Sequence, residues 1–422
     1  MEEPRAFLAE LFEAAVAAAD PGQALEANMP EPPKGRTIVV GAGKGAAQLA
    51  AAFEERWRSP LEGVIVTRYG YAAPCQHLRV IEAAHPVPDE AGIGAGEALM
   101  ATVAGLGPDD LVVALITGGG SALLPAPPGD LTLADEAALN SALLASGAPI
   151  SVMNRIRAEA SRIKAGRLAA LAHPAKVVTL VVSDVPGDDP AEVASGPTIP
   201  GPGKPDDALR LAETYRIDLP DKVKAWIAGG EGASPAPDDP RFLENETRVI
   251  ASARLSLERA AEVARAAGVP AVVLSDRIEG EAKDVGQVLG AIALDCALHD
   301  RPFARPVVLL SGGETTVTLG GASGGRGGRN TEFLLSLALT VEGAKGITAL
   351  AADTDGIDGS EDNAGAFADG GTAAAIRAAG RDPLADLRAH DAWGAFDAAG
   401  SLFVPGPTGT NVNDFRAILV RP

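Results

Sequence analysis

Cysteine is scarce in this chain, and so are aromatic side chains. The two cysteines, Cys75 and Cys296, lie far apart in the sequence and have no ligand-type neighbours. This excludes a disulfide framework and predicts buried thiols in a reducing compartment. Aromatic residues make up 4% of the chain, so we expect a core built from aliphatic side chains.

Positive charge is also in short supply. The chain has 36 Lys and Arg residues against 56 Asp and Glu, a net charge of -20. This balance argues against nonspecific binding to nucleic acid or to anionic membranes. Any anionic ligand must therefore be held by a local positive site.

Long apolar runs are absent from the sequence. None reaches the roughly 20 residues that a membrane-spanning helix needs. The N-terminus is acidic and amphipathic, unlike a signal peptide, with Leu8, Leu11, Phe12, Ala15 and Val16 on one helical face. We expect an N-terminal helix, no membrane partner and a cytoplasmic location.

Length and pattern together predict two domains. A chain of 422 residues is too long for one ordinary core. In its first half, helical stretches such as 46–56 alternate with apolar strands typical of a parallel sheet, expected at residues 37–40, 63–67, 78–83, 110–116 and 176–182. Residues 229–245 are rich in Gly, Pro and acidic residues and form the clearest linker. We predict domains of residues 1–235 and 240–422.

The second half predicts another α/β unit. Helices are expected at 255–267 and 281–300, among strands at 248–251, 271–274, 307–310, 315–319, 347–352, 401–404 and 416–420.

A glycine turn, GAGKG, follows the first predicted strand. Gly41, Gly43 and Gly45 resemble a phosphate-binding turn, although their spacing fits neither the dinucleotide fingerprint nor the Walker loop. Lys44 lies in this turn at a helix start, where it could neutralise charge on a transferring phosphoryl group. The alternative is a solvated turn lysine.

A second glycine turn, TGGGSALL, ends the strand at 110–116. The carboxyl end of a buried parallel strand is where such sheets bind ligands, which makes candidates of Gly118, Gly119, Gly120 and Ser121. A serine nucleophile is the competing interpretation, but the surroundings are not G-x-S-x-G. His85, before Pro86, is either a ligand contact or a satisfied loop histidine, and the sequence favours the loop.

Helical periodicity runs from Leu133 to Leu171 with an interruption at 147–149. Four polar residues in this stretch are spaced three, four and three positions apart, so they would share one helical face. They are Asn154, Arg157, Ser161 and Lys164. Such a face is usually solvated. In so acidic a chain it is also a candidate for holding a carboxylate or phosphate.

Two aspartates, Asp184 and Asp188, flank a Pro-Gly turn after the strand at 176–182. Carboxylates there suit Mg²⁺, which binds through one or two carboxylates plus substrate phosphates. Ordinary turn chemistry is equally compatible with them.

The stretch 311–333 predicts a strand, a turn, a second strand, a glycine-rich loop and a helix start. The glycines within 320–328 leave backbone N–H groups uncovered for an anion, and Arg329 stands where the helix begins. A flexible surface loop is the alternative. An acidic loop at 353–362 lacks the twelfth-position glutamate of an EF-hand, and we place it near this phosphate site.

Eight motifs, taken together and in order, resemble the glycerate 2-kinase family. They are GAGKGA, TGGGSALL, NRIRAEASRIKAGRLA, SDVPGDDPAEVASGPT, SGGETTVTL, GGRNTEF, DTDGIDG and GPTGTNVNDF, and they cover nearly the whole chain. Some members of this family have carried the label hydroxypyruvate reductase. The family often has histidine where Glu159 stands, which bears on substrate preference.

The resemblance implies a fold and a reaction. The fold is α/β, with an N-terminal Rossmann-like parallel sheet covered by helices on both faces, a smaller C-terminal α/β domain, and the active site in the cleft. The reaction is phosphorylation of D-glycerate at its C2 hydroxyl by ATP with Mg²⁺, giving 2-phosphoglycerate. A homodimer is left open.

The resemblance also implies roles for residues. Lys44 and Arg329 match the residues proposed for catalysis, and Asp184 and Asp188 would act through Mg²⁺ or, for Asp184, as base. Asn154, Arg157 and Lys164 are candidates for glycerate's carboxylate. The other candidates for binding nucleotide or substrate are Gly43, Gly118, Gly119, Gly120, Ser121, Gly312, Gly313, Glu314, Asn330, Asp355, Thr410, Asn411 and Asp414.

Two other functions stay open. An NAD(P)H-dependent hydroxypyruvate reductase would need the G-x-G-x-x-G spacing and an acidic residue about 20 positions on, and neither is present in the right form. A noncatalytic sugar-phosphate-binding module would have no need for Lys44, the Asp pair and Arg329 together.

Overall fold

The computed structural model describes residues 3–185, 187–201, 205–230, 232–319 and 325–422. The chain forms two compact units, one of residues 24–250 and one that joins the N-terminal segment up to Gln23 with residues 251–422. The observed units differ from the predicted domains, 1–235 and 240–422, because the N-terminal helix packs with the second half of the chain. The boundary after the linker also lies further on, past one more strand.

The first unit is built on a six-stranded sheet with the order β3-β2-β1-β4-β5-β6. Its strands are β1 (Thr37–Ala42), β2 (Glu62–Arg68), β3 (Leu78–Ala83), β4 (Leu111–Thr117), β5 (Lys176–Val182) and β6 (Glu246–Ala251). All pairings from β3 through β5 are parallel. The strand order reverses where β1 lies beside β4, so the sheet has its topological switch point there.

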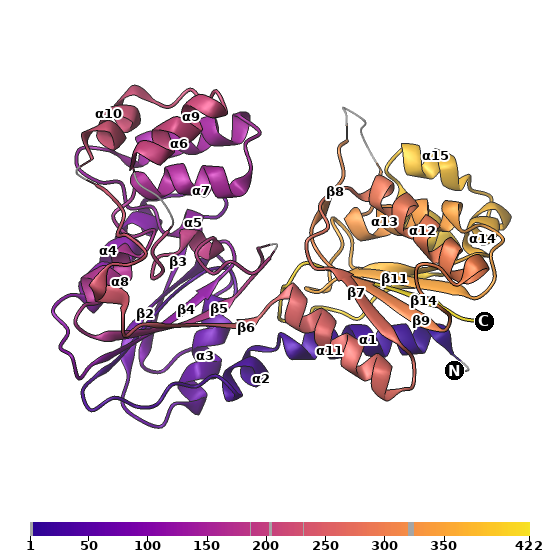
Figure 1. Ribbon diagram of the computed structural model, residues 1–422, viewed down its shortest axis with the longest axis horizontal. Coiled ribbons are helices and arrows are strands. Elements are labelled where there is room, and N and C mark those ends of the chain that lie inside the picture. The colour runs from indigo at the N-terminus through magenta and orange to yellow at the C-terminus, as the bar shows by residue number, and fades with distance from the viewer. Residues whose placement is uncertain (1–2, 186, 202–204, 231, 320–324) are drawn as a thin grey trace. The chain divides into compact units, whose positions relative to one another are not determined.

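Helices cover both faces of this sheet (Figure 1). β1 and β4 are buried along their whole length, as expected of strands that are packed on both sides. α4 (Glu90–Val103) and α8 (Arg167–Ala172) share one core with Ile38 and Val40. α3 (Ala46–Arg56) contacts β2 and β4 from the opposite face. The predicted parallel sheet with helices on both faces is confirmed.

A helical group within the first unit has a core of its own. It consists of α6 (Leu133–Ala145), α7 (Ile150–Glu159), α9 (Pro205–Thr214) and α10 (Asp221–Gly229). Its apolar side chains form a separate cluster that includes Leu143, Ile156 and Ile227. The sequence predicted helical residues at 133–171, where α6 and α7 lie, but neither α9 and α10 nor a separate layer. The remaining short helices of the unit are α2 (Pro21–Glu26), α5 (Gly120–Leu123), η1 (Val193–Ser195) and η2 (Pro240–Phe242).

The prediction that Asn154, Arg157, Ser161 and Lys164 share one helical face is wrong. α7 ends at Glu159. The Ser161 hydroxyl then accepts the backbone N–H groups of Ile163 and Lys164, each at 3.2 Å, and this turns the chain away from the helix axis. Lys164 therefore lies in a loop.

The second unit contains a mixed sheet with the order β13-β12-β11-β14-β9-β7. Its strands are β7 (Ala271–Ser275), β9 (Val307–Ser311), β11 (Ile347–Asp353), β12 (Gly365–Asp369), β13 (Leu402–Phe403) and β14 (Asp414–Val420). β7 and β9 are parallel, and the other pairings are antiparallel. The predicted strand at 315–319 is only β10 (Thr315–Thr316), which pairs with β8 (Gly280–Glu281).

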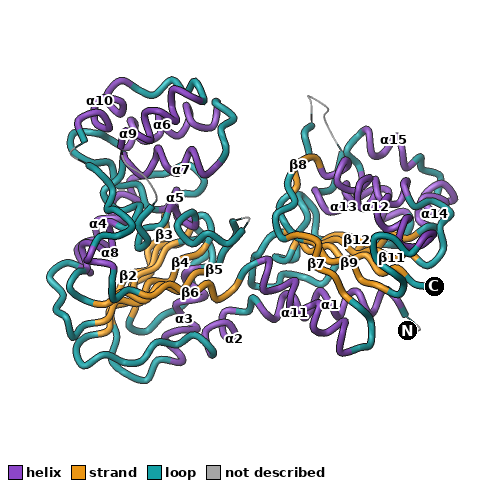
Figure 2. The backbone as a smooth tube through the Cα atoms, in the orientation of Figure 1, coloured by secondary structure: helices purple, strands orange, loops and turns teal. Residues whose placement is uncertain are grey.

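Two helical layers enclose this second sheet (Figure 2). α1 (Pro4–Ala18) and α11 (Ala253–Ala266) cover one face. The other face carries α12 (Ala282–His299), α13 (Arg329–Thr340), α14 (Thr372–Ala378), α15 (Pro383–Arg388) and α16 (Ala392–Ala398). The predicted fold class, two α/β domains, is confirmed.

Two smaller expectations need correction. The strand expected at 248–251 in the second domain is β6, the edge strand of the first sheet, where Asn245 Oδ1 accepts the backbone N–H of Val177 at 2.9 Å. Of the two predicted buried thiols, Cys296 is buried and Cys75 is half-buried. Among the described residues, no helix is both long and apolar enough to cross a bilayer.

α1 belongs to the second unit although most of that unit lies far along the sequence. We therefore predict that a core mutation in α1 destabilises residues 251–422. Phe12 is 1% exposed and its ring meets those of Phe403 and Phe415 edge to face, at 5.1 and 5.8 Å. Phe12→Ala should cost about 3–5 kcal/mol, because a buried ring is replaced by a cavity. Hydrogen exchange read by mass spectrometry should show faster exchange in residues 251–422.

A matched control lies in the first unit. Phe53 is 0% exposed and stacks on Trp57 at 5.2 Å. Phe53→Ala should increase exchange within residues 24–250 and leave β14 protected. Equal effects of the two variants on both units would contradict this description of the N-terminal helix.

Candidate functional site

The two glycine turns of the first unit meet at the topological switch point. One follows β1 and the other follows β4, and the two strands are neighbours. Lys44 donates its backbone N–H to the Gly118 carbonyl at 2.8 Å, and Gly45 donates its own to Thr117 Oγ1 at 3.1 Å. A Cβ at Gly43, where φ is +138°, would lie 2.1 Å from Thr117 Oγ1. Only glycine permits this approach, so the turns form one surface.

Lys44 extends its side chain over the second turn. A Cβ built on Gly119 would lie 2.9 Å from Lys44 Cγ and 3.1 Å from its Cε. The residue is half-buried, and among the described residues its ammonium group makes no hydrogen bond or ion pair. In a chain with 56 acidic residues, a partly buried lysine without a carboxylate partner indicates a place for an anionic ligand.

His85 lies over the same glycine. It follows β3, and its Nε2 atom would be 3.0 Å from a Cβ on Gly119. Burial, with Lys44 and then Arg68 nearby, lowers the pKa of the imidazole below 6.5. The sequence favoured a loop histidine here, and only the folded chain brings this ring beside Lys44.

Three more polar residues lie near the two glycine turns: Asp184, Ser121 and Asn154. A Cβ on Gly118 would lie 1.8 Å from Asp184 Oδ2, so the carboxylate rests directly on that glycine. Ser121 Oγ lies 2.8 Å from Ser195 Oγ, and Ser195 Oγ donates to Asn154 Oδ1 at 3.4 Å. The structure therefore brings residues of both turns together with the loop after β5 and with α7.

Ser195 lies in a segment with a strained backbone conformation. Ala194 and Ser195, in η1, have φ angles of +53° and +60°. Such angles are costly for residues with a Cβ, and they cluster at functional sites. A Cβ on Gly120 would lie 2.6 Å from Ala194 Cβ, so η1 packs tightly on the second glycine turn.

A cavity of 340 Å³ adjoins this cluster, between η1, α7 and α9. Its polar lining includes Ser151, Asn154, Arg155, Glu192 and Ser195. Asn154 Nδ2 donates to Glu192 Oε2 at 2.7 Å, so amide, hydroxyl and carboxylate groups stand side by side. Of these residues only Asn154 was among the sequence candidates, because the others come together only in the fold.

Arg157 and Lys164 are less available than their charge suggests. Arg157 donates from Nε to Asn140 Oδ1 at 2.7 Å and from Nη1 to Asn154 Oδ1 at 3.0 Å. Lys164 is 2% exposed and its Nζ pairs with Glu136 Oε1 at 2.9 Å. Arg157 thus supports Asn154, whereas the charge of Lys164 is neutralised within the protein.

Glu159 does not line the cavity. Its carboxylate is 1% exposed and pairs with Arg155 at 2.5 Å and with Arg167 at 3.7 Å. Ser234 Oγ donates to the same carboxylate at 2.6 Å, which ties α7 to the segment after α10. This residue fixes the linker to the unit's core rather than contacting the cavity.

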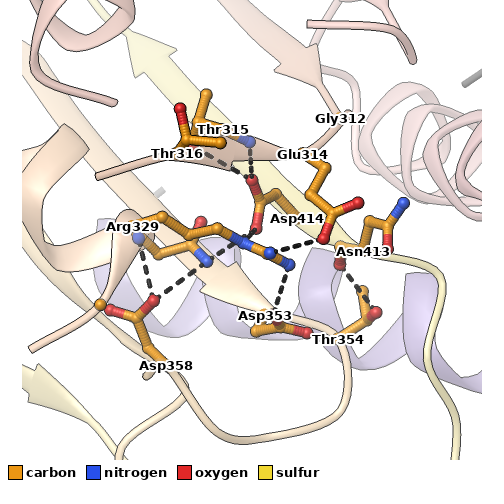
Figure 3. A network of polar contacts seen from close by, with 12 residues as sticks. Gly312, Glu314, Thr315, Thr316, Arg329, Asp353, Thr354, Asp358, Asn413 and Asp414 are labelled. Atoms are coloured by element: carbon orange, nitrogen blue, oxygen red, sulfur yellow. Dashed lines mark hydrogen bonds and ion pairs between the residues drawn. The ribbon is translucent and has the colours of Figure 1, made fainter. Parts of the chain in front are cut away.

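The second unit holds its own polar cluster around Arg329 (Figure 3). Three carboxylates bind this guanidinium, with Asp414 at 2.6 Å, Asp353 at 2.7 Å and Glu314 at 2.9 Å. Burial lowers the pKa of Arg329, but Asp414, Asp353 and Glu314 raise it further than burial lowers it. Of the three carboxylates Glu314 is the most exposed, at 49%, and so the most easily displaced.

The start of α13 is occupied by Asp358. Its carboxylate accepts the backbone N–H groups of Asn330 at 2.9 Å and Thr331 at 2.8 Å. The helix does begin at Arg329, as predicted. Its first amide donors, however, are bound to a buried aspartate, which leaves fewer of them for an external anion.

The other candidates of the second unit support this cluster. Asn330 Nδ2 donates to Asp414 Oδ1 at 2.9 Å, and Gly313 accepts the backbone N–H of Asp414 at 3.1 Å. The buried Arg416 guanidinium donates to Gly312 O at 3.2 Å and also binds the Asp414 carboxylate. The Asp355 backbone N–H donates to Asp353 Oδ1 at 3.2 Å.

Thr410 and Asn411 serve the loop before β14. Thr410 Oγ1 donates to Ala19 O at 2.9 Å and so ties the loop to the end of the N-terminal helix. Asn411 Oδ1 accepts the backbone N–H of Asn413 at 2.9 Å. Within the predicted glycine-rich loop, residues 320–324 lie outside the described part of the chain.

The fold and the clusters define a two-unit α/β protein with a candidate anion site at the switch point of its parallel sheet. Two family models match the chain: the domain of unknown function DUF4147 over residues 7–228 and the MOFRL family over residues 307–414. The first alone spans more than half of the chain. The chain belongs to the family that these two models describe. Relatives named glycerate 2-kinase confirm the resemblance that the motifs indicated.

Its relatives carry two kinds of name. A protein of Agrobacterium vitis, with the provisional name hydroxypyruvate reductase, is 52% identical over 99% of this chain and 94% of its own. D-glycerate 2-kinase of Thermotoga maritima is 37% identical over 96% and 95%. The crystal structure of glycerate kinase from Thermotoga maritima matches with a TM-score of 0.89 and 36% identity, covering 98% of each chain.

The Arg329 cluster predicts a pH-dependent stability. Burial, with Asp355 and Asp414 nearby, raises the pKa of Asp353 from 3.8 to about 8, although Arg329 opposes the shift. Between these values the native state binds more protons than the unfolded state, so the free energy of unfolding falls as pH rises. The contribution is fully present below pH 3.8 and is lost at up to about 1.4 kcal/mol per pH unit.

Asp353→Asn tests this, because an amide cannot titrate. Urea unfolding at pH 5, 6.5 and 8 should show the wild type losing more stability with rising pH than the variant. Asp362→Asn, an exposed aspartate of the neighbouring loop, is the control. Parallel pH profiles for wild type and Asp353→Asn would show that Asp353 is ionised throughout.

Proposed function

We propose that this chain transfers the γ-phosphoryl group of ATP to the C2 hydroxyl of D-glycerate, giving 2-phosphoglycerate and ADP. The chain is a kinase of its family, as the named glycerate kinases with high coverage support. The choice of D-glycerate and of its C2 hydroxyl rests on the Thermotoga maritima relative named D-glycerate 2-kinase.

One observation carries the proposal on this chain: Lys44 is half-buried over a surface of two interlocked glycine turns, and no described residue pairs with its ammonium group. Phosphoryl transfer needs positioning and charge stabilisation more than it needs an activated nucleophile. A lysine at the switch point, with backbone N–H groups around it, supplies a cation for the phosphate oxygens. A solvated turn lysine would be exposed, whereas Lys44 is half-buried with its side chain on the second turn.

The cavity beside Ser195 suits the acceptor. D-glycerate is a small anion with two hydroxyl groups, and the lining offers the Asn154 amide, the Ser195 hydroxyl and the Glu192 carboxylate as hydroxyl partners. Arg155 supplies the only guanidinium among the residues lining this cavity, which also include Asp207, and Glu159 already binds its Nη1 atom. We therefore propose that glycerate lies there, with its reacting hydroxyl toward Ser121 and Lys44.

Mg²⁺ is part of the proposal, and Asp184 fits it. Its carboxylate lies on Gly118, beside the glycine that Lys44 covers. Among the described residues no group of three or more His, Cys, Asp or Glu side chains is placed to hold a metal, so phosphate oxygens would complete the coordination. Asp188 stays a second candidate ligand. A bound Mg²⁺ would neutralise charge on the phosphate oxygens.

A role for Arg329 in the same reaction also stays a proposal. Its Nη1 atom is held by Glu314, the most exposed of its three partners. A phosphate oxygen could take the place of that carboxylate while Asp353 and Asp414 keep the guanidinium in position. Arg329 would then act without leaving its buried ion pairs.

The reaction itself is the first test. Purified protein with ATP, Mg²⁺ and D-glycerate should release ADP, and phosphorus–proton correlation NMR should show phosphate on C2. Phosphate on C3 would contradict the regiochemistry while leaving the kinase in place. Oxidation of NADH with hydroxypyruvate, without ADP release, would instead favour the reductase.

Lys44→Met should lower kcat by about 100- to 1,000-fold, the usual effect of removing one preorganised charge from a transition state. Lys34→Met, which removes an exposed lysine of the same unit, is the control and should retain full activity. Unchanged kcat in Lys44→Met would remove the basis of the proposed mechanism. Arg329→Lys, assayed alongside, should also lower kcat. Because the change disturbs the ion pairs with Asp353 and Asp414, the result supports contact with the phosphoryl group only if urea unfolding shows unchanged stability.

A further inference from the structure

His85 is the titratable side chain of the site to which the proposed reaction gives no role. Its ring lies on Gly119 together with the Lys44 side chain, and Nε2 is the ring atom that faces this glycine. His85 thus reaches the switch point although it follows β3, the edge strand of the sheet.

The ring also lacks the contacts of a structural histidine. His85 is half-buried, and neither ring nitrogen makes a hydrogen bond among the described residues. His390 in the second unit shows the contrast: its Nδ1 lies 2.8 Å from Glu332 Oε2, in a buried pair. Because no described residue binds either ring nitrogen and the residue is only half-buried, both nitrogens are available for a ligand.

Burial is the first cause that lowers the pKa of the His85 imidazole below 6.5, and the charges around the ring act in the same direction. Lys44 faces it from the turn after β1 and Arg68 from the end of β2, and both oppose a positive charge on the ring. Gly119 brings no charge, and the Asp184 carboxylate rests on the neighbouring Gly118. A neutral imidazole has a lone pair that can accept a proton.

We propose that His85 is a catalytic residue, the general base that takes the proton from the acceptor hydroxyl. This rests on the proposed phosphoryl transfer. The hydroxyl oxygen forms a bond to the γ-phosphorus, and the bond between that phosphorus and the bridging oxygen breaks, with its electron pair leaving on ADP. The hydroxyl proton passes to the unprotonated ring nitrogen of His85 and later to water.

The position of His85 suits this order of events. The transition state of phosphoryl transfer is loose, so the hydroxyl loses its proton late and a moderately basic group is sufficient. Phosphate oxygens beside Lys44 would offset the cationic charge that now disfavours protonation of the ring. The imidazole becomes a better base once nucleotide is bound.

His85→Gln should lower kcat by about 100-fold, the lower end of what a general base contributes, with the KM for ATP changed little. Because the neutral ring is the active form, wild-type kcat/KM should fall at acidic pH, below about 6.5. That acidic limb should disappear in His85→Gln. His77→Gln, which removes an exposed histidine of the same unit, should keep both activity and pH profile.

Chemical rescue separates proton transfer from positioning. In His85→Ala, free imidazole should restore a substantial part of kcat, and imidazoles of lower pKa should restore less. Full activity of His85→Gln with an unchanged pH profile would overturn the proposal for His85 alone. No glycerate-dependent ADP release by the wild type would overturn the proposed function and this inference with it.

If His85→Gln does not fold, the wild-type protein can be used to test whether His85 contacts the phosphate site. Nitrogen-15 NMR of the histidine rings should show the pKa of His85 rising when a non-hydrolysable ATP analogue and Mg²⁺ bind. No change at His85 under saturating analogue would contradict contact with the phosphate site.

Discussion

The hydrogen bond between the Lys44 backbone N–H and the Gly118 carbonyl, at 2.8 Å, joins the two loops on which the candidate site depends. It exists because β1 and β4 are parallel neighbours at the point where the strand order reverses. It also requires Gly43, since any Cβ there would overlap Thr117. The Lys44 side chain over Gly119, Asp184 on Gly118 and η1 on Gly120 all lie on the surface that this contact joins.

Charge pairing distinguishes the two candidate cations. Arg329 is bound by three carboxylates and forms the centre of a buried network with Arg416 and Asp414. Lys44 has no such partner among the described residues. In a chain of net charge -20, a cation that the protein leaves unpaired is the stronger indication of an anionic ligand. We therefore place the centre of the proposed chemistry at Lys44 and give Arg329 a supporting part.

Much of this could be predicted from local sequence. β3, β5 and α3 have the predicted bounds. For β5 the reason is burial on both sides of a parallel sheet, which gives an uninterrupted apolar run. Predictions failed where a side-chain contact, either local or distant in sequence, decides the structure. Helical periodicity continued past Glu159, but the Ser161 hydroxyl ends that pattern. Lys164 was predicted to bind a ligand, but its ammonium group pairs with Glu136, 28 positions away in the sequence.

The sequence by itself determined the family, the α/β class and the glycine turns, since these are properties of short segments and their order. Only the tertiary structure decided which charges remain available, because pairing depends on residues far apart along the chain. It also brought His85 from an edge strand to the central loops, and it attached the N-terminal helix to the second unit through Phe12. Both outcomes depend on packing between distant segments, which no local pattern encodes.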